Sequence, residues 1–550
     1  MRLFVAVAVL LSLNCFAQQS PMTKTTNSSA GTADTLTNSI DSEKIRAHVR
    51  FLSSDLLEGR GPGQRGNAIA ADYIATQLDL AGLEPAGENG TYFQKVPMVA
   101  VKTLPESTFT LIGKNREAMT LRGGDDFIAH SETMQPDIDV DAPVVFVGYG
   151  INAPEYHWND YAGVDVKGKV VLMFTNEPPS PLPNSDPALF RGKELTYYGR
   201  WTYKYEEAAR QGAIGAILIH QTEMASYPWT VLSRGWGGET TFLRGTTEPK
   251  LQVASWITFD SGKKLLASSG LDIDRLLEQI RQRGFTPIDL GAKAKIHLVS
   301  ATRNFDGQNV IARLDGDDPE LRREAVIFTA HHDHFGIVHS SAGDKIFHGA
   351  VDNASGVAML LEVARIAAQR HAKRSMIFAT VDAEEQNLLG AKYLAEHSPI
   401  PLKNIILDLN FEGLWIMPVG VPEELQVSGA ERTTFYPQVE QVAKNFRMTI
   451  RPDPFPEAGY YFRSDHFSFA RAGVPAFSVA AGNKFEGHDL AWGEAQAKDF
   501  VAHRYHQPED EYRPEMDFRA NARIAQIAYA LGWIAANDVQ KVSWKSEESR

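Results

Sequence analysis

The sequence predicts an α/β fold with a mostly parallel central sheet flanked by helices, into which a strand-rich domain is inserted. Short and almost wholly apolar runs at 325–330, 375–381, 404–409 and 474–480 alternate with helical patterns. Such runs are typical of parallel strands that are buried on both faces. Between 136 and 288 the pattern changes to short β-branched and aromatic runs broken by Gly and Pro, which indicates a separate strand-rich domain.

Length and composition agree with this organisation. The chain has 550 residues, several times the length that one core usually organises, so more than one domain is expected. A hydrophobic fraction of 43% and a charged fraction of 22% are typical of an ordinary globular protein. The net charge of −13, with no run of basic residues, argues against a nucleic-acid partner. Beyond the N-terminal segment, no stretch approaches the roughly 20 apolar residues of a membrane-spanning helix.

The N-terminal segment has the pattern of a secretory signal peptide. Arg2 precedes an apolar stretch from Leu3 to Leu13, and small residues suited to cleavage follow up to Ala17. The segment therefore predicts an exported protein, either periplasmic or secreted. Cys15 is the only cysteine, so no intramolecular disulfide is possible, and a lipid anchor on Cys15 is the alternative form of export.

Composition and periodicity divide the chain into six parts. The Ser- and Thr-rich stretch after the signal peptide has little apolar surface to bury, so it is interpreted as a flexible leader. The Gly-rich stretch 59–67 lies between two helical patterns and lacks a phosphate-binding Lys, so it is interpreted as a connector. The predicted parts are the signal peptide (1–17), the leader (18–40), the N-terminal part of the catalytic domain (41–135), the inserted domain (136–288), the main catalytic domain (289–536) and a polar tail (537–550).

Polar side chains follow the predicted strands at the point where each strand ends. His331 follows the first strand, Glu384 and Glu385 follow the second, and Glu412 follows the third. Asp352 lies where a loop enters the next helix. Because the carboxyl ends of parallel strands meet at one edge of a sheet, these carboxylates would repel one another unless a cation lay among them. Imidazole and carboxylate ligands without a thiolate suit Zn²⁺ or a related divalent ion.

Six strings in this region resemble metallopeptidase family 28, the co-catalytic zinc aminopeptidases of the aminopeptidase S and aminopeptidase Y type. The strings are AHHDH (330–334), GAVDNASG (349–356), DAEEQNLLG (382–390), NFEG (410–413), RSDHFSFARAGVPA (463–476) and YHQPED (505–510). The inserted domain resembles a protease-associated domain, which many members carry at this place. The resemblance implies a zinc aminopeptidase fold and a zinc-dependent aminopeptidase.

The resemblance also implies two Zn²⁺ ions per chain, bound by five residues. Glu412 stands where many relatives have Asp, and Asp408, which lies inside the predicted strand, is the less favoured candidate for this position. His332 and His334 are interpreted as loop residues or as residues that contact and orient the ligands, rather than as further ligands. The implied ligands are His331, Glu385, Glu412, His506 and the bridging Asp352.

Further residues receive roles through the same resemblance. Glu384 is the implied general base, which activates water shared by the metals and returns the proton to the leaving amine. Tyr505 stabilises the oxyanion, and Asp333 is expected to accept the second imidazole N–H of His331. Ser464, Asp465 and His466 either shape the substrate pocket or form a turn.

The sequence therefore predicts an exported dizinc exopeptidase that acts on peptides with a free N-terminus. One alternative is a glutaminyl cyclase-like zinc acyltransferase, and another is a non-catalytic receptor-like protein, as in the transferrin-receptor branch. The complete ligand set argues against both. The sequence contains neither a His-Glu-x-x-His helix nor a Gly-x-Ser-x-Gly elbow, so other hydrolase classes are disfavoured. Side-chain preference and oligomeric state stay open.

Overall fold

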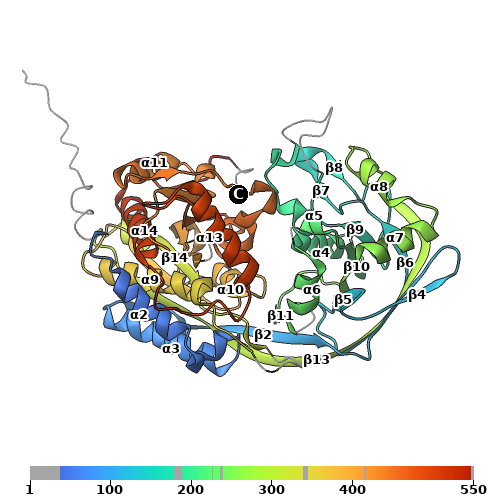
Figure 1. Ribbon diagram of the computed structural model, residues 1–550, viewed down its shortest axis with the longest axis horizontal. Coiled ribbons are helices and arrows are strands. Elements are labelled where there is room, and N and C mark those ends of the chain that lie inside the picture. The colour runs from blue at the N-terminus through green and yellow to red at the C-terminus, as the bar shows by residue number, and fades with distance from the viewer. Residues whose placement is uncertain are drawn as a thin grey trace, which may run out of the picture.

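The computed structural model consists of two lobes that lie side by side and are joined along one edge by the strands β2 and β13 (Figure 1). The predicted signal peptide, Cys15 and the leader up to residue 36 lie outside the residues that the structure describes. The described residues are 37–178, 189–225, 227–235, 239–338, 343, 345–413 and 416–546.

The first lobe is built on a sheet with the strand order β11-β2-β13-β17-β14-β18-β21-β19. Its centre, from β17 to β21, is parallel, and its outer pairs are antiparallel, which confirms the predicted fold class. The short β20 pairs with β19 at the far edge. The strands are β2 Phe93–Thr103, β11 Glu239–Leu243, β13 Ile288–Leu314, β14 Ala325–His331, β17 Ser375–Val381, β18 Ile405–Asn410, β19 Glu424–Ser428, β20 Thr449–Ile450 and β21 Ala476–Ala481.

Helices cover both faces of this sheet. Phe328 and Phe378 point from β14 and β17 into a core with α2, α3, α9 and α14, whereas the alternate residues Ile327 and Ile377 point into a core with α10 and α12. Burial on both faces explains why these strands are apolar throughout. The helices of this lobe are α2 Ser42–Leu52, α3 Arg65–Leu80, α9 Ser355–Ala367, α10 Leu389–Glu396, α11 Tyr436–Asn445, α12 His466–Arg471, α13 Leu490–His503 and α14 Arg519–Asn537.

The second lobe has its own sheet, in the order β4-β3-β13-β6-β9-β10-β12-β5, and an apolar core on each side of it. Strands β3 to β5 pair in this sheet although they precede residue 136, and the predicted domain boundaries themselves stay predictions. The elements are β3 Thr108–Ile112, β4 Ala118–Leu121, β5 Phe127–His130, β6 Asp137–Phe146, β9 Val170–Phe174, α4 Trp201–Arg210, β10 Gly215–Ile219, α5 Thr222–Ala225, α6 Trp229–Gly235, β12 Val253–Ile257, α7 Phe259–Ser268 and α8 Ile273–Ile280.

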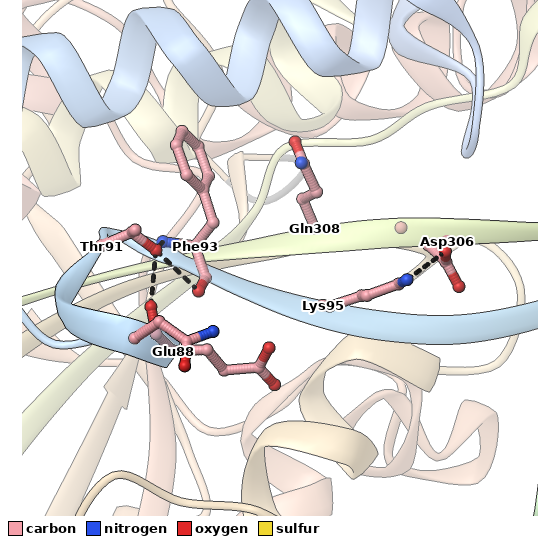
Figure 2. Close-up of a pocket in the computed structure, with 8 residues that line it drawn as sticks. Glu88, Thr91, Phe93, Lys95, Asp306 and Gln308 are labelled. Atoms are coloured by element: carbon pink, nitrogen blue, oxygen red, sulfur yellow. Dashed lines mark hydrogen bonds and ion pairs between the residues drawn. The ribbon is translucent and has the colours of Figure 1, made fainter.

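Strand β13 belongs to both sheets. Its first half pairs with β3 and β6 of the second lobe, and from Ser300 onward it pairs with β2 and then β17 of the first lobe. Figure 2 shows a pocket of about 390 Å³ beside the β2–β13 ladder, where Lys95 forms an ion pair with Asp306 at 2.7 Å. The residues that line this pocket include no predicted metal ligand. In an open α/β sheet, ligands bind instead at the carboxyl ends of the parallel strands.

The stacked rings beneath the parallel strands give a first prediction. The Phe328 ring is fully buried and stacks on Phe378 with a centroid distance of 5.1 Å. We expect Phe328→Ala to lower the free energy of unfolding of the first lobe by about 3–5 kcal/mol, because it leaves a cavity behind β14. Denaturant unfolding followed by circular dichroism measures the change. The control is Phe455→Ala, whose ring is 47% exposed, and equal effects of the two substitutions would contradict this account of the core.

Candidate metal centre

The carboxyl ends of the parallel strands bring the five predicted ligands together. His331 is the last residue of β14, Glu385 lies in the loop after β17, and Glu412 lies in the loop after β18. Asp352 belongs to the single turn η7 (Ala350–Ala354) that precedes α9, and His506 follows α13. These residues come from separate segments of the chain, and ion-pair distances connect all five.

The carboxylate of Asp352 lies between two imidazoles. Its Oδ1 is 3.4 Å from Nε2 of His331, and its Oδ2 is 3.3 Å from Nε2 of His506. Nε2 of His506 is also 3.2 Å from Oε2 of Glu385, and Nε2 of His331 is 3.7 Å from Oε1 of Glu412. One oxygen of Asp352 therefore faces each half of the centre, which is the arrangement expected of a carboxylate that bridges two metal ions.

Two clusters of donor atoms compact enough for a metal ion occur here, and each combines imidazole with carboxylates. The first contains His331, Glu384 and Glu412, and the second contains His334, Asp352 and Glu385. Nδ1 of His334 lies 2.7 Å from Oε1 of Glu385. This contact agrees with the expectation that His334 supports a ligand, and its place in the second cluster also makes it a candidate donor.

The electrostatics of the centre indicate a requirement for positive charge. Burial raises the pKa of Glu384 well above its usual range, and the charges of Glu385 and Asp465 raise it further. Both carboxylate oxygens of Asp465 are buried without a hydrogen-bond partner among the described residues. Burial disfavours ionised Asp352, but His331 and His506 outweigh it and hold the pKa of Asp352 well below its usual range. Carboxylates and imidazoles gathered in one buried volume fit divalent cations, and nitrogen and oxygen donors suit zinc.

Glu384 and Tyr505 lie beside the ligands. The carboxylate of Glu384 is 4.0 Å from Nε2 of His331, whereas that of its neighbour Glu385 faces His506. The Tyr505 ring packs on the His506 ring with a centroid distance of 3.7 Å. Burial raises the pKa of Tyr505 well above its usual range, and Asp352 and Glu385 add to this, so the phenol keeps its proton at neutral pH.

Asp333 holds the loop that carries the base. Its carboxylate accepts the backbone N–H groups of Glu384 at 3.0 Å and of Glu385 at 3.4 Å. Nδ1 of His331 lies 3.3 Å from the backbone carbonyl oxygen of Asp333 and 3.6 Å from its Oδ1. The expected imidazole contact is therefore made through the carbonyl oxygen, because the carboxylate is engaged by the two backbone donors.

Ser464, Asp465 and His466 are all buried where the chain enters α12, which fits the predicted turn, and a role in shaping the substrate pocket stays a prediction. The Ser464 hydroxyl donates to Oε2 of Glu412 at 2.8 Å and so orients that ligand. Nδ1 of His466 lies 3.1 Å from Oγ of Ser478, in the interior. Because α12 begins at His466, the backbone turns there and carries this ring away from the centre.

Arg60 supports the centre from below and was not found by sequence reasoning. Its fully buried guanidinium donates to the carbonyl oxygens of His332 (2.8 Å), His348 (2.7 Å) and Gly349 (2.9 Å), and also to that of Leu52. The Arg60 guanidinium therefore holds both the segment that begins with His331 and the turn that carries Asp352. The stretch 59–67, interpreted as a connector, is a structural part of the site.

Asp510 is a second supporting residue. Its buried carboxylate accepts the backbone N–H of Val351 at 3.0 Å and that of Asp352 at 3.0 Å. Burial raises the pKa of Asp510 to about 6, and these two donors oppose that rise. The string YHQPED carries Asp510 only five residues after Tyr505, but its backbone partners lie more than 150 positions away and could not be inferred from the string.

The fold and the site together are those of an α/β metalloprotein. A further carboxylate, Glu384, lies beside the predicted ligands at the carboxyl edge of the sheet, as expected of a metal-dependent hydrolase. The aminopeptidase from Aneurinibacillus sp. strain AM-1 superimposes with a TM-score of 0.51 and 19% sequence identity, over 92% of this chain and 97% of that chain. This likeness establishes the fold.

Residues 309–532 match the model of peptidase family M28, which agrees with the predicted resemblance to this family. It is 30% identical over 174 residues to the vacuolar membrane protease of Schizosaccharomyces japonicus, covering 32% of this chain and 16% of that protein. It is 29% identical over 214 residues to a probable zinc metalloprotease of Pyrenophora teres f. teres, covering 34% of this chain and 40% of that protein. The matches support the prediction of a zinc-dependent peptidase and span only part of each relative. The second lobe lies outside the family match, so its assignment as a protease-associated domain stays a prediction.

The predicted location is contradicted by these relatives. Vacuolar membrane proteases of Schizosaccharomyces japonicus, Schizosaccharomyces pombe and Saccharomyces cerevisiae are among them, and their names point to a vacuolar membrane. The prediction of a periplasmic or secreted protein, with a lipid anchor at Cys15 as the alternative, is therefore wrong. Among the described residues, no helix has the length and apolar character needed to cross a membrane.

The contacts of Arg60 lead to a prediction about metal affinity. We expect Arg60→Leu to weaken zinc binding about 10–100-fold, because the carbonyl groups that hold the His331 and Asp352 segments lose their donor. Each buried carbonyl left without a partner also costs about 1–3 kcal/mol of folding free energy. Competition with a chromogenic chelator measures the affinity. The control is Arg65→Leu at the start of α3, whose side chain is 71% exposed. A folded Arg60→Leu protein with unchanged zinc affinity would contradict the role of Arg60 in holding the ligand segments.

The charge state of His506 predicts proton release on metal binding. Burial disfavours the charged ring, but Glu385 and Asp352 outweigh it and raise the pKa of His506 to about 10. Because a zinc ligand must be neutral imidazole, binding at pH 7 displaces this proton. Below pH 10, zinc affinity therefore strengthens about tenfold for each unit by which the pH rises, for each proton released. Calorimetry in phosphate and in Tris measures the release. The release should fall by about one proton in His506→Gln, and identical values for the two proteins would refute the expectation.

Proposed function

We propose that the protein is a dizinc exopeptidase that removes residues from the N-terminus of peptides. The observation that carries the proposal is the position of Asp352, whose two oxygens face His331 on one side and His506 on the other. His331 and Glu412 would hold one ion, Glu385 and His506 the other, and Asp352 would bind both. Zinc supplies Lewis acidity, which polarises a carbonyl group and lowers the pKa of water.

Glu384 suits the role of general base. The raised pKa of Glu384 makes its carboxylate a stronger base, closer in proton affinity to the water from which it would take a proton. The Glu384 side chain is 11% exposed, so it is sheltered but open to the centre. It accepts a proton from the attacking water and transfers this proton to the nitrogen of the leaving amine. Asp333 fixes the position of the base through the backbone N–H of Glu384.

Tyr505 supports the second half of the reaction. Its phenol stays protonated at neutral pH and lies next to His506, so it donates a hydrogen bond to the carbonyl oxygen as negative charge develops there. A free α-ammonium group is attracted by the carboxylates around the centre that would not bind metal, among them the partly exposed Glu384. This attraction favours a substrate with a free N-terminus over one whose N-terminus is blocked.

The test combines metal content with one substitution. We expect elemental analysis to give about two zinc ions per chain, and Glu384→Gln to retain them while kcat for aminoacyl anilides falls about 10²–10⁴-fold. Glu509→Gln, an exposed carboxylate in the loop of Tyr505, is the control and should keep full activity. N-acetylation of the substrate should abolish hydrolysis.

Three results would contradict the proposal. Hydrolysis of acetylated and free substrates at the same rate would exclude an aminopeptidase mode. One zinc per chain with cyclisation of N-terminal Gln would favour the glutaminyl cyclase-like acyltransferase. Two zinc ions without turnover of any peptide or anilide would favour the receptor-like alternative.

A further inference from the structure

Two arginines, one from each lobe, lie beside the metal centre where the two lobes meet, a region called the seam below. Neither has a carboxylate partner among the described residues. Arg200 directly precedes α4 of the second lobe. Arg463 directly precedes Ser464, whose hydroxyl donates a hydrogen bond to Glu412. Both side chains are half-buried, and the Nε atom of each is buried without a hydrogen-bond partner. Among the described residues, neither guanidinium forms an ion pair, whereas Arg432 and Arg471 near the same seam pair with Glu194 and Glu206.

Contacts between the lobes bring the two arginines to the same place. The Tyr197 ring lies 6.0 Å from the Phe462 ring and 5.0 Å from the Phe467 ring, and the backbone N–H of Arg200 donates to the carbonyl oxygen of Tyr197 at 3.0 Å. Arg463 follows Phe462 directly, and its guanidinium lies 5.2 Å from the ring centre of Tyr460. One guanidinium is therefore presented from each side of the seam.

Electrostatics agree with this arrangement. Burial, followed by the charge of Arg463, lowers the pKa of Arg200 to about 9, so the two guanidiniums repel each other while Arg200 stays charged at neutral pH. Tyr505 is close enough to raise the pKa of Arg200, and the charge of Arg463 in turn acts on Tyr505. The pair thus lies on the Tyr505 side of the centre. An anion placed between the two guanidiniums would relieve the repulsion and form charge-assisted hydrogen bonds.

The site as a whole is bipolar. Carboxylates surround the metal ligands, whereas Arg200 and Arg463 provide positive charge next to Tyr505. A short peptide has the same character, with an α-ammonium at one end and a carboxylate at the other. Because a residue spans about 3.3–3.6 Å, the carboxylate of a dipeptide or tripeptide lies within about 10 Å of its first peptide bond. The arginine pair therefore suits the end of a peptide whose first carbonyl lies at Tyr505.

We propose that Arg200 and Arg463 form a subsite that binds a carboxylate of the substrate on the leaving-group side of the scissile bond. The carboxylate is either the C-terminal α-carboxylate of a dipeptide or tripeptide or the side chain of an acidic residue after the scissile bond. The inference rests on the proposed function and narrows its substrate class to peptides that carry negative charge close to their N-terminus.

The experiment uses the full-length, zinc-loaded protein and three peptides: Leu-Gly-Gly, its C-terminal amide, and Leu-Glu-Gly amide. We expect kcat/KM for the preferred carboxylate-bearing peptide to exceed that for Leu-Gly-Gly amide at least about tenfold. Arg200→Gln and Arg463→Gln should each remove most of this preference, chiefly through KM, and leave kcat/KM for Leu-Gly-Gly amide within about twofold. Arg200→Lys should restore part of it, because the charge is kept while the paired donors are lost.

The matched control is Arg471→Gln. Arg471 also crosses the seam, but it is paired with Glu206 at 3.0 Å, so its loss reports on lobe packing without touching the proposed subsite. A preference for Leu-Gly-Gly identifies the C-terminal carboxylate as the group recognised, and a preference for Leu-Glu-Gly amide identifies the side chain. Equal kcat/KM for all three peptides, or equal losses in Arg200→Gln and Arg471→Gln, would overturn the proposal.

A binding measurement separates failure of the subsite from failure of the proposed function. Calorimetric titration of the Glu384→Gln protein with the same peptides needs no turnover. Tighter binding of a carboxylate-bearing peptide than of Leu-Gly-Gly amide, lost when Arg463→Gln is added, would support the subsite even if the wild-type protein hydrolyses none of them. Binding without any such preference would overturn the subsite while leaving the exopeptidase proposal intact.

Discussion

The mutual repulsion of buried carboxylates is the constraint on which the rest of the first lobe depends. Asp352, Glu384 and Glu385 lie in one nearly closed volume together with Asp465, whose oxygens have no hydrogen-bond partner among the described residues. Charges held at such distances in a medium of low polarity would drive the segments apart unless other groups opposed them. Imidazoles oppose them directly, and backbone hydrogen bonds fix the loops so that repulsion cannot be relieved by movement. The centre is therefore electrostatically poised for cations before any ion arrives.

The restraints come from elements distant in sequence. Arg60 holds two ligand-bearing segments through their carbonyl oxygens, and Asp510 holds the turn of Asp352 through two N–H groups. Asp333 does the same for the loop of Glu384. In each case a charged side chain binds backbone rather than another side chain. Every substitution except one by proline keeps the backbone polar groups, so such restraints depend mainly on one side chain each and leave the ligand side chains free to bind metal.

The fold and the ligand positions could be predicted from the sequence because both depend on local patterns. Wholly apolar strands indicate a sheet buried on both faces, and a polar residue at or just after a strand end lies at the carboxyl edge, as His331 and Glu412 do. Arg60 could not be found in this way, since a guanidinium that binds carbonyl groups leaves no signature in the residues it contacts. The direction of His466 was also beyond prediction, because it depends on where α12 begins.

The strand shared by the two lobes constrains how this architecture can change. Side chains alternate between the faces of a strand, and β13 passes from one sheet into the other near Ser300, where it begins to pair with β2. An insertion of one residue at that junction would turn every later side chain to the opposite face, exchanging core for surface in one lobe. An insertion of two residues would preserve the faces but move the second lobe along the ladder by about 6.6 Å. Length changes at this junction would therefore shift one lobe relative to the other, and with it the position of Arg200 relative to Arg463.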